Sequence, residues 1–294
     1  MSLIINNNLM AMNATRNLNN AYSSLATSVE RLSSGLRINS AADDAAGLAI
    51  RELMRAEIAS LKQGSRNAND AISMIQTADG ALGVIDEKLI RMKELAEQAA
   101  TGTYNSDQRL MIESEYQAMA SEITRIANST KFSGIYLLNG ALSGAHDGSK
   151  LQSTGQLKVH FGSSNDCSED YYYIKIGTST ASALGLGNQS GTVAGHAIST
   201  QSLAQQALDA INNAIISKDK IRASLGALQN RLENTVSNLQ IQAENIQAAE
   251  SRISDADIAT EMTAFTRAQI LTQAGVAMLS QANSLPQMAL RLIG

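Results

Sequence analysis

Two pairs of neighbouring aspartates are the residues whose types and spacing come closest to those of a catalytic centre. Asp43 stands next to Asp44, and Asp255 lies two residues before Asp257. Two carboxyl groups can act as general acid and general base, but neighbouring residues of a helix point about 100° apart, and no nucleophile accompanies either pair. Both pairs precede apolar helical patterns, where an aspartate can accept hydrogen bonds from free backbone amides. We therefore predict helix caps here, and no enzymatic activity.

Metal and redox chemistry lack the residue patterns that they require. His146, His160 and His196 show no HExxH spacing, and the single Cys167 excludes both an internal disulfide and a CxxC pair. We interpret Cys167 as incidental. The segment 185–191, GLGNQSG, departs from the GxGxxG phosphate-binding pattern and is typical of a loop. The sequence predicts no metal site and no cofactor.

The composition favours long helices and excludes several classes of partner. The 294 residues are 44% hydrophobic but 3% aromatic, with no Trp and one Pro, so small and aliphatic side chains must form the core. The Lys and Arg residues are scattered and the net charge is -4, which argues against nucleic-acid binding. No apolar run reaches the ~20 residues of a membrane span. No cleavable secretory signal is visible, and these signals alone predict a cytoplasmic protein.

Heptad spacing of apolar residues predicts a helical rod. The pattern is most regular over residues 54–99, within a helix expected to span 45–100 and to be roughly 80 Å long at about 1.5 Å per residue. A short turn at 101–107 should fold the next helix back antiparallel, and a returning helix follows residue 200. Thr235 and Gln242 stand at its seam positions, where they either fix the register or mark a stretch where the seam turns outward. The predicted rod core comprises Leu61, Ile75, Leu82, Ile85, Leu89, Met92, Ile112, Met119, Ile123, Leu225, Leu228, Leu232, Leu239 and Ile246.

The central region differs in character from the rest. The segment KFSGIYLLNG at 131–140 and the Gly- and Ser-rich stretches after it predict turns and loops. Two short strands are expected over 157–161 and 171–176, separated by the turn-rich sequence GSSNDCSED.

Two hinges separate the terminal segments from the rod. At the first, Ser33, Ser34 and Gly35 end one helical pattern before the next begins at Ala45, and the second hinge lies at 251–262. We expect the terminal segments to pair, but a two-helix pair buries too little surface to offset its chain entropy. Burial against other copies would stabilise them, and head-to-tail contacts would propagate as a filament. The predicted polymerisation seams contain Leu18, Tyr22, Leu25, Val29, Leu32, Ile258, Met262, Phe265, Leu271, Met278 and Leu285.

Long stretches of the chain resemble bacterial flagellin. The resemblance rests on SSGLRINSAADDAAGLAI at the first hinge, on GSRNANDAISMIQTADGALGVIDEKLIRMKELAEQAATGT, and on SRISDADIATEM with LSQANSLPQMALRLIG near the C-terminus. The resemblance covers roughly 1–140 and 200–294 and implies a mainly α fold: a long antiparallel coiled-coil rod with paired terminal helices and a small β-hairpin region. The expected parts are 1–42 (pairing with 255–294), 43–140, 141–199, 200–254 and 255–294.

The resemblance also implies a function, a location and partners. It implies a subunit that polymerises into the flagellar filament for swimming motility and is exported without a cleaved signal, which replaces the cytoplasmic prediction with an extracellular one. The implied partners are the chain itself, an export chaperone over residues 265–292, the export apparatus, and the cap and junction proteins. A Toll-like innate immune receptor would contact Arg91, Leu95, Gln98 and Glu115. The alternatives are a hook-filament junction protein and a secreted adhesin or receptor ligand, and the similarity over 65–103 favours the filament.

Overall fold

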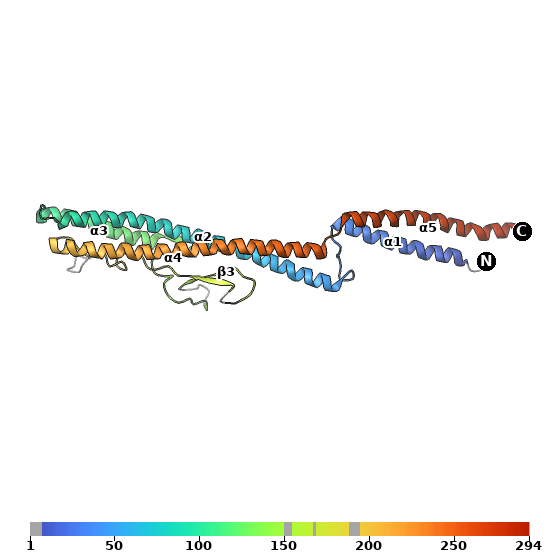
Figure 1. The fold of residues 1–294 in the computed structure, drawn as a ribbon, viewed down its shortest axis with the longest axis horizontal. Helices are drawn as coiled ribbons and strands as arrows, with labels where there is room; N and C mark the ends of the chain where they lie inside the picture. The colour runs from blue at the N-terminus through green and yellow to red at the C-terminus, as the bar shows by residue number, and fades with distance from the viewer. Residues whose placement is uncertain (1–7, 150–154, 167–168, 188–194, 294) are drawn as a thin grey trace. The chain divides into compact units, whose positions relative to one another are not determined.

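The computed structural model describes residues 8–149, 155–166, 169–187 and 195–293. Helices dominate it and the strands form two small hairpins (Figure 1), so the predicted mainly α fold is confirmed. Cys167 lies outside the described residues. The elements in chain order are α1 (Leu9–Ser34), α2 (Ala45–Ala100), α3 (Ser106–Ser129), β1 (Lys131–Phe132), β2 (Ile135–Tyr136), β3 (Leu157–His160), β4 (Tyr171–Ile174), α4 (Gln201–Ser254) and α5 (Ile258–Ile293).

The chain divides into two compact units. One comprises Met1–Ile58 with Glu244–Gly294 and contains α1 and α5, and the other comprises Ala59–Ala243. The long helices α2 and α4 contribute residues to both units. We call these the terminal unit and the central unit.

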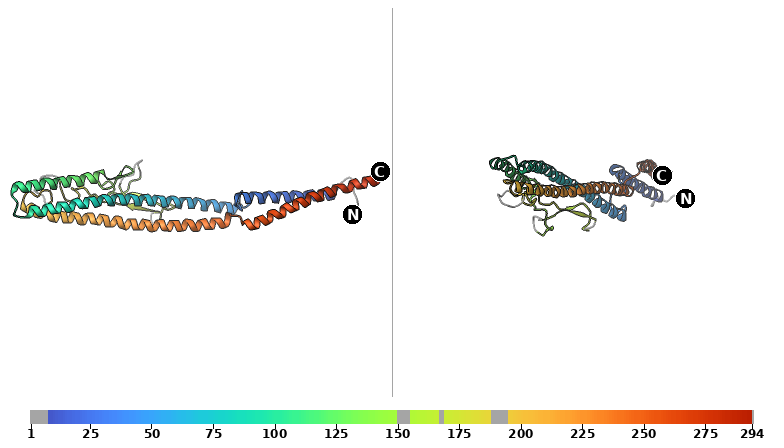
Figure 2. Two further views of the ribbon diagram at one scale, coloured as in Figure 1. Left: turned by 90° about the horizontal axis from the view of Figure 1, so that it is seen from above. Right: turned by 60° about the vertical axis from the view of Figure 1, so that its left-hand side comes forward.

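The core of the central unit lies between α2, α3 and α4, which run alongside one another (Figure 2). Both neighbours are antiparallel to α2, because Arg91 of α2 pairs with Glu115 of α3 at 2.9 Å, and Asp79 of α2 pairs with Arg222 of α4 at 2.7 Å. The heptad positions of α2 are buried along this core: Leu61, Ala68, Ile75, Leu82, Leu89 and Ala96 in one row, and Ala71, Ala78, Ile85, Met92 and Ala99 in the other.

Charged side chains join α2 to α4 beside the apolar core. The Lys218 side chain is almost completely buried and donates to Asp86 of α2 as well as to Asp219 at 2.8 Å. The Arg222 guanidinium, hydrogen-bonded to Asp79, lowers the pKa of that carboxyl below its ordinary value. Because a buried ammonium group must find carboxylate partners, these contacts admit one register between the two helices.

The β3–β4 hairpin is antiparallel, with Val159 opposite Tyr172, and the two strand predictions at 157–161 and 171–176 are confirmed with shorter bounds. Its inner side packs on the core through Val159 and Ile174. A side chain at Gly64 of α2 would place a Cβ 1.9 Å from the Phe161 carbonyl oxygen, so only glycine lets the chain lie this close to the helix.

One sequence prediction is corrected in the central region, and one alternative that the sequence left open is decided in α4. The segment 131–140 was expected to contain turns alone, but β1 and β2 pair across a two-residue turn at Ser133 and Gly134. Gln242 is exposed, whereas the neighbouring Ala243 is buried, so the seam moves by one residue there and Gln242 does not fix the register.

The burial of the α2 heptads leads to a stability prediction. Leu82 is 0% exposed, so Leu82→Asp places an uncompensated charge in the core and should lower the free energy of unfolding by roughly 3–5 kcal/mol. Val84→Asp, two residues away at a side chain that is 42% exposed, should cost less than about 1 kcal/mol. Thermal and urea unfolding followed by circular dichroism measure both, and equal losses would refute the assigned register.

Candidate assembly surface on the terminal helix pair

Helices α1 and α5 pair antiparallel within the terminal unit, side by side in Figures 1 and 2. Near the start of α1, the Asn8 side chain donates to the Ala282 carbonyl at 2.8 Å. Near its end, Arg31 forms an ion pair of 3.7 Å with Glu261 at the start of α5. These contacts join the beginning of each helix to the far part of the other.

The side chains buried between α1 and α5 are small. They are Ala21, Ser28, Ala268, Thr272 and Ala282. Small side chains at seven-residue spacing allow two helix axes to approach closely, as Ala21 and Ser28 do on α1 and Ala268, Gly275 and Ala282 do on α5. A larger side chain enters the contact where glycine leaves room: a Cβ added at Gly275 would lie 3.0 Å from Cδ1 of Leu18, which is half-buried.

The predicted seam residues are therefore only partly placed in this contact. Leu18, Leu25 and Leu32 of α1 and Phe265 of α5 are half-buried. The exposed members are Tyr22, Val29, Ile258, Met262, Leu271 and Met278. The side chain of Leu285 lies outside the described residues. The residues of α1 that are buried in this contact are Ala21 and Ser28, each one residue before the exposed Tyr22 and Val29. The role of the predicted seams in contacts between copies stays a prediction.

Large apolar side chains consequently lie on the outer surface of the pair. Besides the seam residues, they include Leu9, Met10, Met12, Ile270, Val276 and Met288. An exposed set of this kind on a helix pair marks a surface that binds other protein chains.

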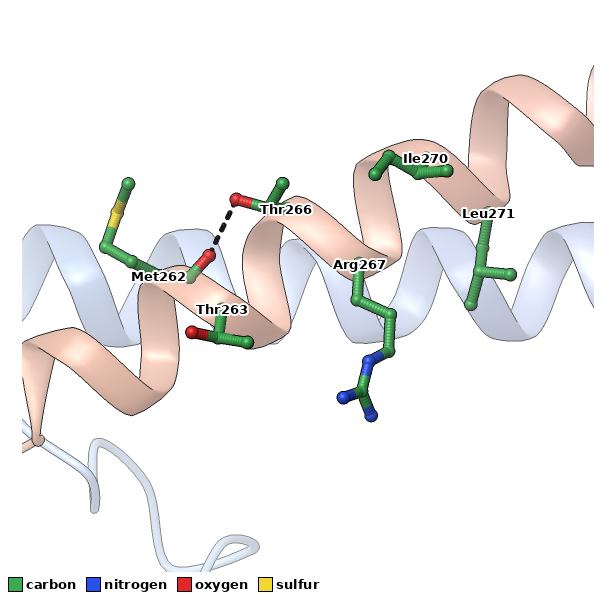
Figure 3. A pocket seen from close by; sticks show the side chains of 6 residues that line it. All are labelled: Met262, Thr263, Thr266, Arg267, Ile270 and Leu271. Carbon is green, nitrogen blue, oxygen red and sulfur yellow. Dashed lines mark hydrogen bonds between the residues drawn. The ribbon is translucent and has the colours of Figure 1, made fainter.

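Three grooves indent this surface. The largest, about 970 Å³, runs between the helices and is lined by residues including Met10, Leu18, Leu271 and Met278. A groove of about 490 Å³ is lined along α5 by Met262, Ile270 and their neighbours (Figure 3). The third, of about 700 Å³, includes Met12 and Leu279 in its lining. Their walls are mostly apolar, as a surface that receives side chains of another chain requires.

The two hinges are held together by backbone hydrogen bonds in the terminal unit. Gly35 ends α1 in the left-handed region, with φ 71°, and its N–H donates to the Arg31 carbonyl at 2.8 Å. Ala256 N–H donates to the Gly35 carbonyl at 3.0 Å. The Arg37 guanidinium donates to the Ile253 carbonyl at 2.7 Å. The ends of α1 and α4 are thereby fixed to each other.

The sequence predicts helix caps at the four aspartates of the hinges, and Asp44 and Asp257 are such caps. Asp43 caps a turn, and the Asp255 carboxyl accepts from the hydroxyls of Ser251 and Ser254. Asp44 precedes α2 and accepts from Gly47 N–H at 2.8 Å, and Asp257 precedes α5 and accepts from Ala259 N–H at 2.9 Å. Asp43 accepts from the backbone and side chain of Ser40, and these hydrogen bonds hold the pKa of the Asp43 carboxyl below its ordinary value. The hydrogen bonds from Thr260 lower the pKa of Asp257 in the same way. Carboxylates bound by local donors in this manner stabilise chain turns.

Within the described ranges, no group of three or more His, Cys, Asp or Glu side chains could hold a metal ion. Among these same residues, no helix is long and apolar enough to cross a membrane.

The predicted rod-core residues are buried or partly buried. The buried members are Leu61, Ile75, Leu82, Ile85, Leu89, Met92, Ile123, Leu225, Leu232 and Leu239, and the partly buried ones are Ile112, Met119, Leu228 and Ile246.

The four residues assigned to a receptor contact do not form one accessible patch. Leu95 is buried in the core of the central unit and is not available at the surface. Arg91 bonds to Glu115 at 2.9 Å, and Gln98 donates to the Tyr104 hydroxyl at 3.0 Å, so the accessible polar members are engaged within the chain.

A helical terminal pair with exposed apolar grooves, and no metal-binding cluster among the described residues, is typical of α-helical structural proteins that assemble with other chains. The family models for the bacterial flagellin N-terminal and C-terminal helical regions match residues 5–143 and 208–293. The chain therefore belongs to the bacterial flagellin family, whose members are structural subunits of the flagellar filament.

Similar proteins span the whole chain. A "flagellar filament 33 kDa core protein" of Treponema phagedenis is 43% identical and covers 99% of this chain and 100% of its own length. The flagellin of Bacillus subtilis is 40% identical, with 98% and 99% covered. The fold is similar to that of a putative flagellar hook-associated protein from Vibrio parahaemolyticus, with a TM-score of 0.56, 13% identity, and 72% of this chain and 100% of that one covered.

The hinge geometry leads to a prediction with opposite signs at two glycines. A Cβ at Gly35 meets nothing within 4 Å, so Gly35→Ala costs only the left-handed conformation, about 1 kcal/mol of unfolding free energy. Gly226, inside α4, is equally open, and Gly226→Ala should raise that free energy by about 0.5–1 kcal/mol. Urea unfolding of both variants measures the difference, and a stabilising Gly35→Ala would contradict the assigned helix end.

Proposed function

We propose that copies of this chain polymerise head-to-tail and laterally into the flagellar filament through the outer surface of the α1–α5 pair. The observation that carries the proposal is the distribution of side-chain size on these helices. Small residues such as Ala21 and Ala268 are buried inside the pair, whereas large apolar residues such as Leu271 and Met278 are exposed. The pair therefore has more apolar surface to bury than it buries by itself.

Burial of that surface supplies the free energy of assembly. A Leu, Val or Met side chain transferred from water to a packed interior contributes about 1.5–3 kcal/mol. The exposed side chains on α1 and α5 belong to both helices, so a subunit can bury them against several neighbours at once. Different surfaces of one subunit that bind each other without closing a ring produce an open helical filament.

The outer surface of the α1–α5 pair is exposed before assembly, and we expect other proteins to bind the chain before and during assembly. An export chaperone that covers residues 265–292 would hide Ile270, Leu271 and Val276, which are exposed along α5. Such a cover would prevent polymerisation inside the cell. The further partners proposed from family membership are the export apparatus, through which the chain passes without a cleaved signal, and the filament cap and junction proteins. A Toll-like receptor would reach Arg91, Gln98 and Glu115 but not Leu95.

The alternative functions are not favoured. The full-length relatives are named flagellin or flagellar filament core protein, and their similarity extends over 99% of this chain. The hook-associated protein shares the fold at 13% identity, which is too low to transfer its role. A junction protein or an adhesin therefore lacks an observation of its own.

A charge on the outer surface of α5 should block assembly without unfolding the subunit. Leu271 is 54% exposed, so Leu271→Asp leaves the α1–α5 contact intact but places a carboxylate in any interface that covers it. We expect elongation from sheared filament seeds, followed by light scattering and electron microscopy, to fall at least tenfold. The unfolding midpoint of the monomer should stay unchanged.

Leu110 offers a matched control for this variant. It is 56% exposed but belongs to α3 in the central unit. Leu110→Asp introduces the same charge at the same degree of exposure, and elongation should remain within twofold of that of the unchanged chain. Equal loss in both variants would show that α5 has no special part in assembly.

Amide hydrogen exchange tests whether assembly stabilises the terminal pair. The buried side chains between α1 and α5 are small, so the pair should open readily in the monomer, whereas residues 68–99 in the central core should be protected. In filaments, exchange across residues 9–34 and 258–293 should slow at least a hundredfold. Full protection of these residues in the monomer would mean that the pair is stable without neighbours.

A further inference from the structure

Five of the six exposed methionines of the described residues lie on the terminal helix pair. Met74 and Met92 are buried in the core of the central unit. Five others are exposed on the helices of the terminal pair: Met10, Met12, Met262, Met278 and Met288. Unbranched methionine side chains are flexible and adapt to irregular surfaces, so their concentration on an assembly surface has a packing reason.

Each of the three grooves on the pair has a methionine in its wall. Met10 and Met278 come from different helices and line the large groove between α1 and α5. Met12 lines the groove that includes Leu279. Met262 lies with Thr263 and Thr266 in the lining of the groove along α5, and its side chain is exposed (Figure 3). The four sulfur-bearing side chains therefore stand where side chains of another copy would enter.

We propose that these exposed methionines are oxidation sites that prevent an oxidised subunit from joining the filament, an inference that rests on the proposed function. The oxidant is a peroxide. Its electrophilic oxygen bonds to the thioether sulfur as the O–O bond breaks, the sulfur loses two electrons, and with hydrogen peroxide the other oxygen leaves as water. The product is methionine sulfoxide, which a methionine sulfoxide reductase converts back.

Oxidation changes the surface without changing the fold of the subunit. The sulfoxide oxygen is a strong hydrogen-bond acceptor, and in the monomer it remains in water because the side chain is exposed. In an assembled subunit the same oxygen would lose its water in a groove whose walls are mostly apolar, and its larger, polar group would no longer fit the side chains that enter there. A chain oxidised before assembly therefore stays folded but fails to add, whereas a chain already in the filament has its thioethers covered.

Peptide mass spectrometry of the full-length monomer treated with dilute hydrogen peroxide tests the sites themselves. Oxidation at Met10, Met12, Met262 and Met278 should be at least tenfold faster than at Met74 and Met92. In filaments, the same four should oxidise at least tenfold more slowly than in the monomer. Equal rates at exposed and buried methionines, or no protection in filaments, would overturn the inference.

Seeded elongation tests the consequence. Peroxide treatment of the monomer should lower its elongation rate at least tenfold, and treatment with a methionine sulfoxide reductase should restore it. A variant with Met10, Met12, Met262, Met278 and Met288 changed to Leu, which keeps the side-chain volume, should elongate equally well before and after peroxide. An oxidised wild-type chain that elongates normally would overturn the inference.

Met111 gives the matched control. It is 71% exposed but belongs to α3, so peroxide oxidises it in every variant. Met111→Leu should leave the chain as sensitive to peroxide as before, and protection by this single change would place the effect on α3 and overturn the inference. Failure of the untreated wild-type chain to elongate would instead contradict the proposed function, and the oxidation rates in the monomer would still report on the sites.

Discussion

The close approach of α1 and α5 is the constraint on which the assembly surface depends. The side chains buried on the two helices are small, including Ala21 and Ser28 on α1 and Ala268 and Thr272 on α5, and Leu18 packs beside Gly275. Helical geometry then places Tyr22 and Val29, one residue further along, on the outside. The small residues of the internal contact thus leave large apolar side chains exposed on the outer surface of the pair.

The two units differ in how much stability their own contacts provide. The central unit buries complete Leu, Ile and Tyr side chains, among them Leu82, Ile123 and Tyr116, and each contributes about 1.5–3 kcal/mol. The terminal pair buries mainly Ala, Ser and Thr, which contribute much less per residue while the ordered backbone costs as much. In the assembly that we propose, its helices would therefore gain most from neighbours, and the folding of the ends would be coupled to assembly.

How far the sequence predicts this arrangement depends on which helix is considered. In α2 both heptad rows are apolar from residue 68 on, so only one face can be buried, and its register and the start at Ala45 agree with the structure. In α1 the large apolar residues that lie on the outer face have the spacing of a buried helix contact. Their pattern therefore does not indicate that Ala21 and Ser28 are the buried residues. The seven-residue recurrence of small side chains was the available signal. The strands β1 and β2 are two residues long, too short for any alternation to show.

Charged residues are distributed differently between the two units: ion pairs join α2 to α4 in the central unit, whereas α1 carries few charges. In the central unit, Asp79 and Asp86 pair with Arg222 and Lys218, so a displacement of α2 along α4 would break both ion pairs between the helices and leave the buried Lys218 ammonium with Asp219 of its own helix. Helix α1, by contrast, carries only Arg16, Glu30 and Arg31 as charged residues. In the assembly that we propose, contacts between copies over α1 would therefore be specified mainly by shape, through side chains entering grooves. Shape complementarity of this kind tolerates few changes in volume or polarity, and a single oxygen atom added to a groove methionine is such a change.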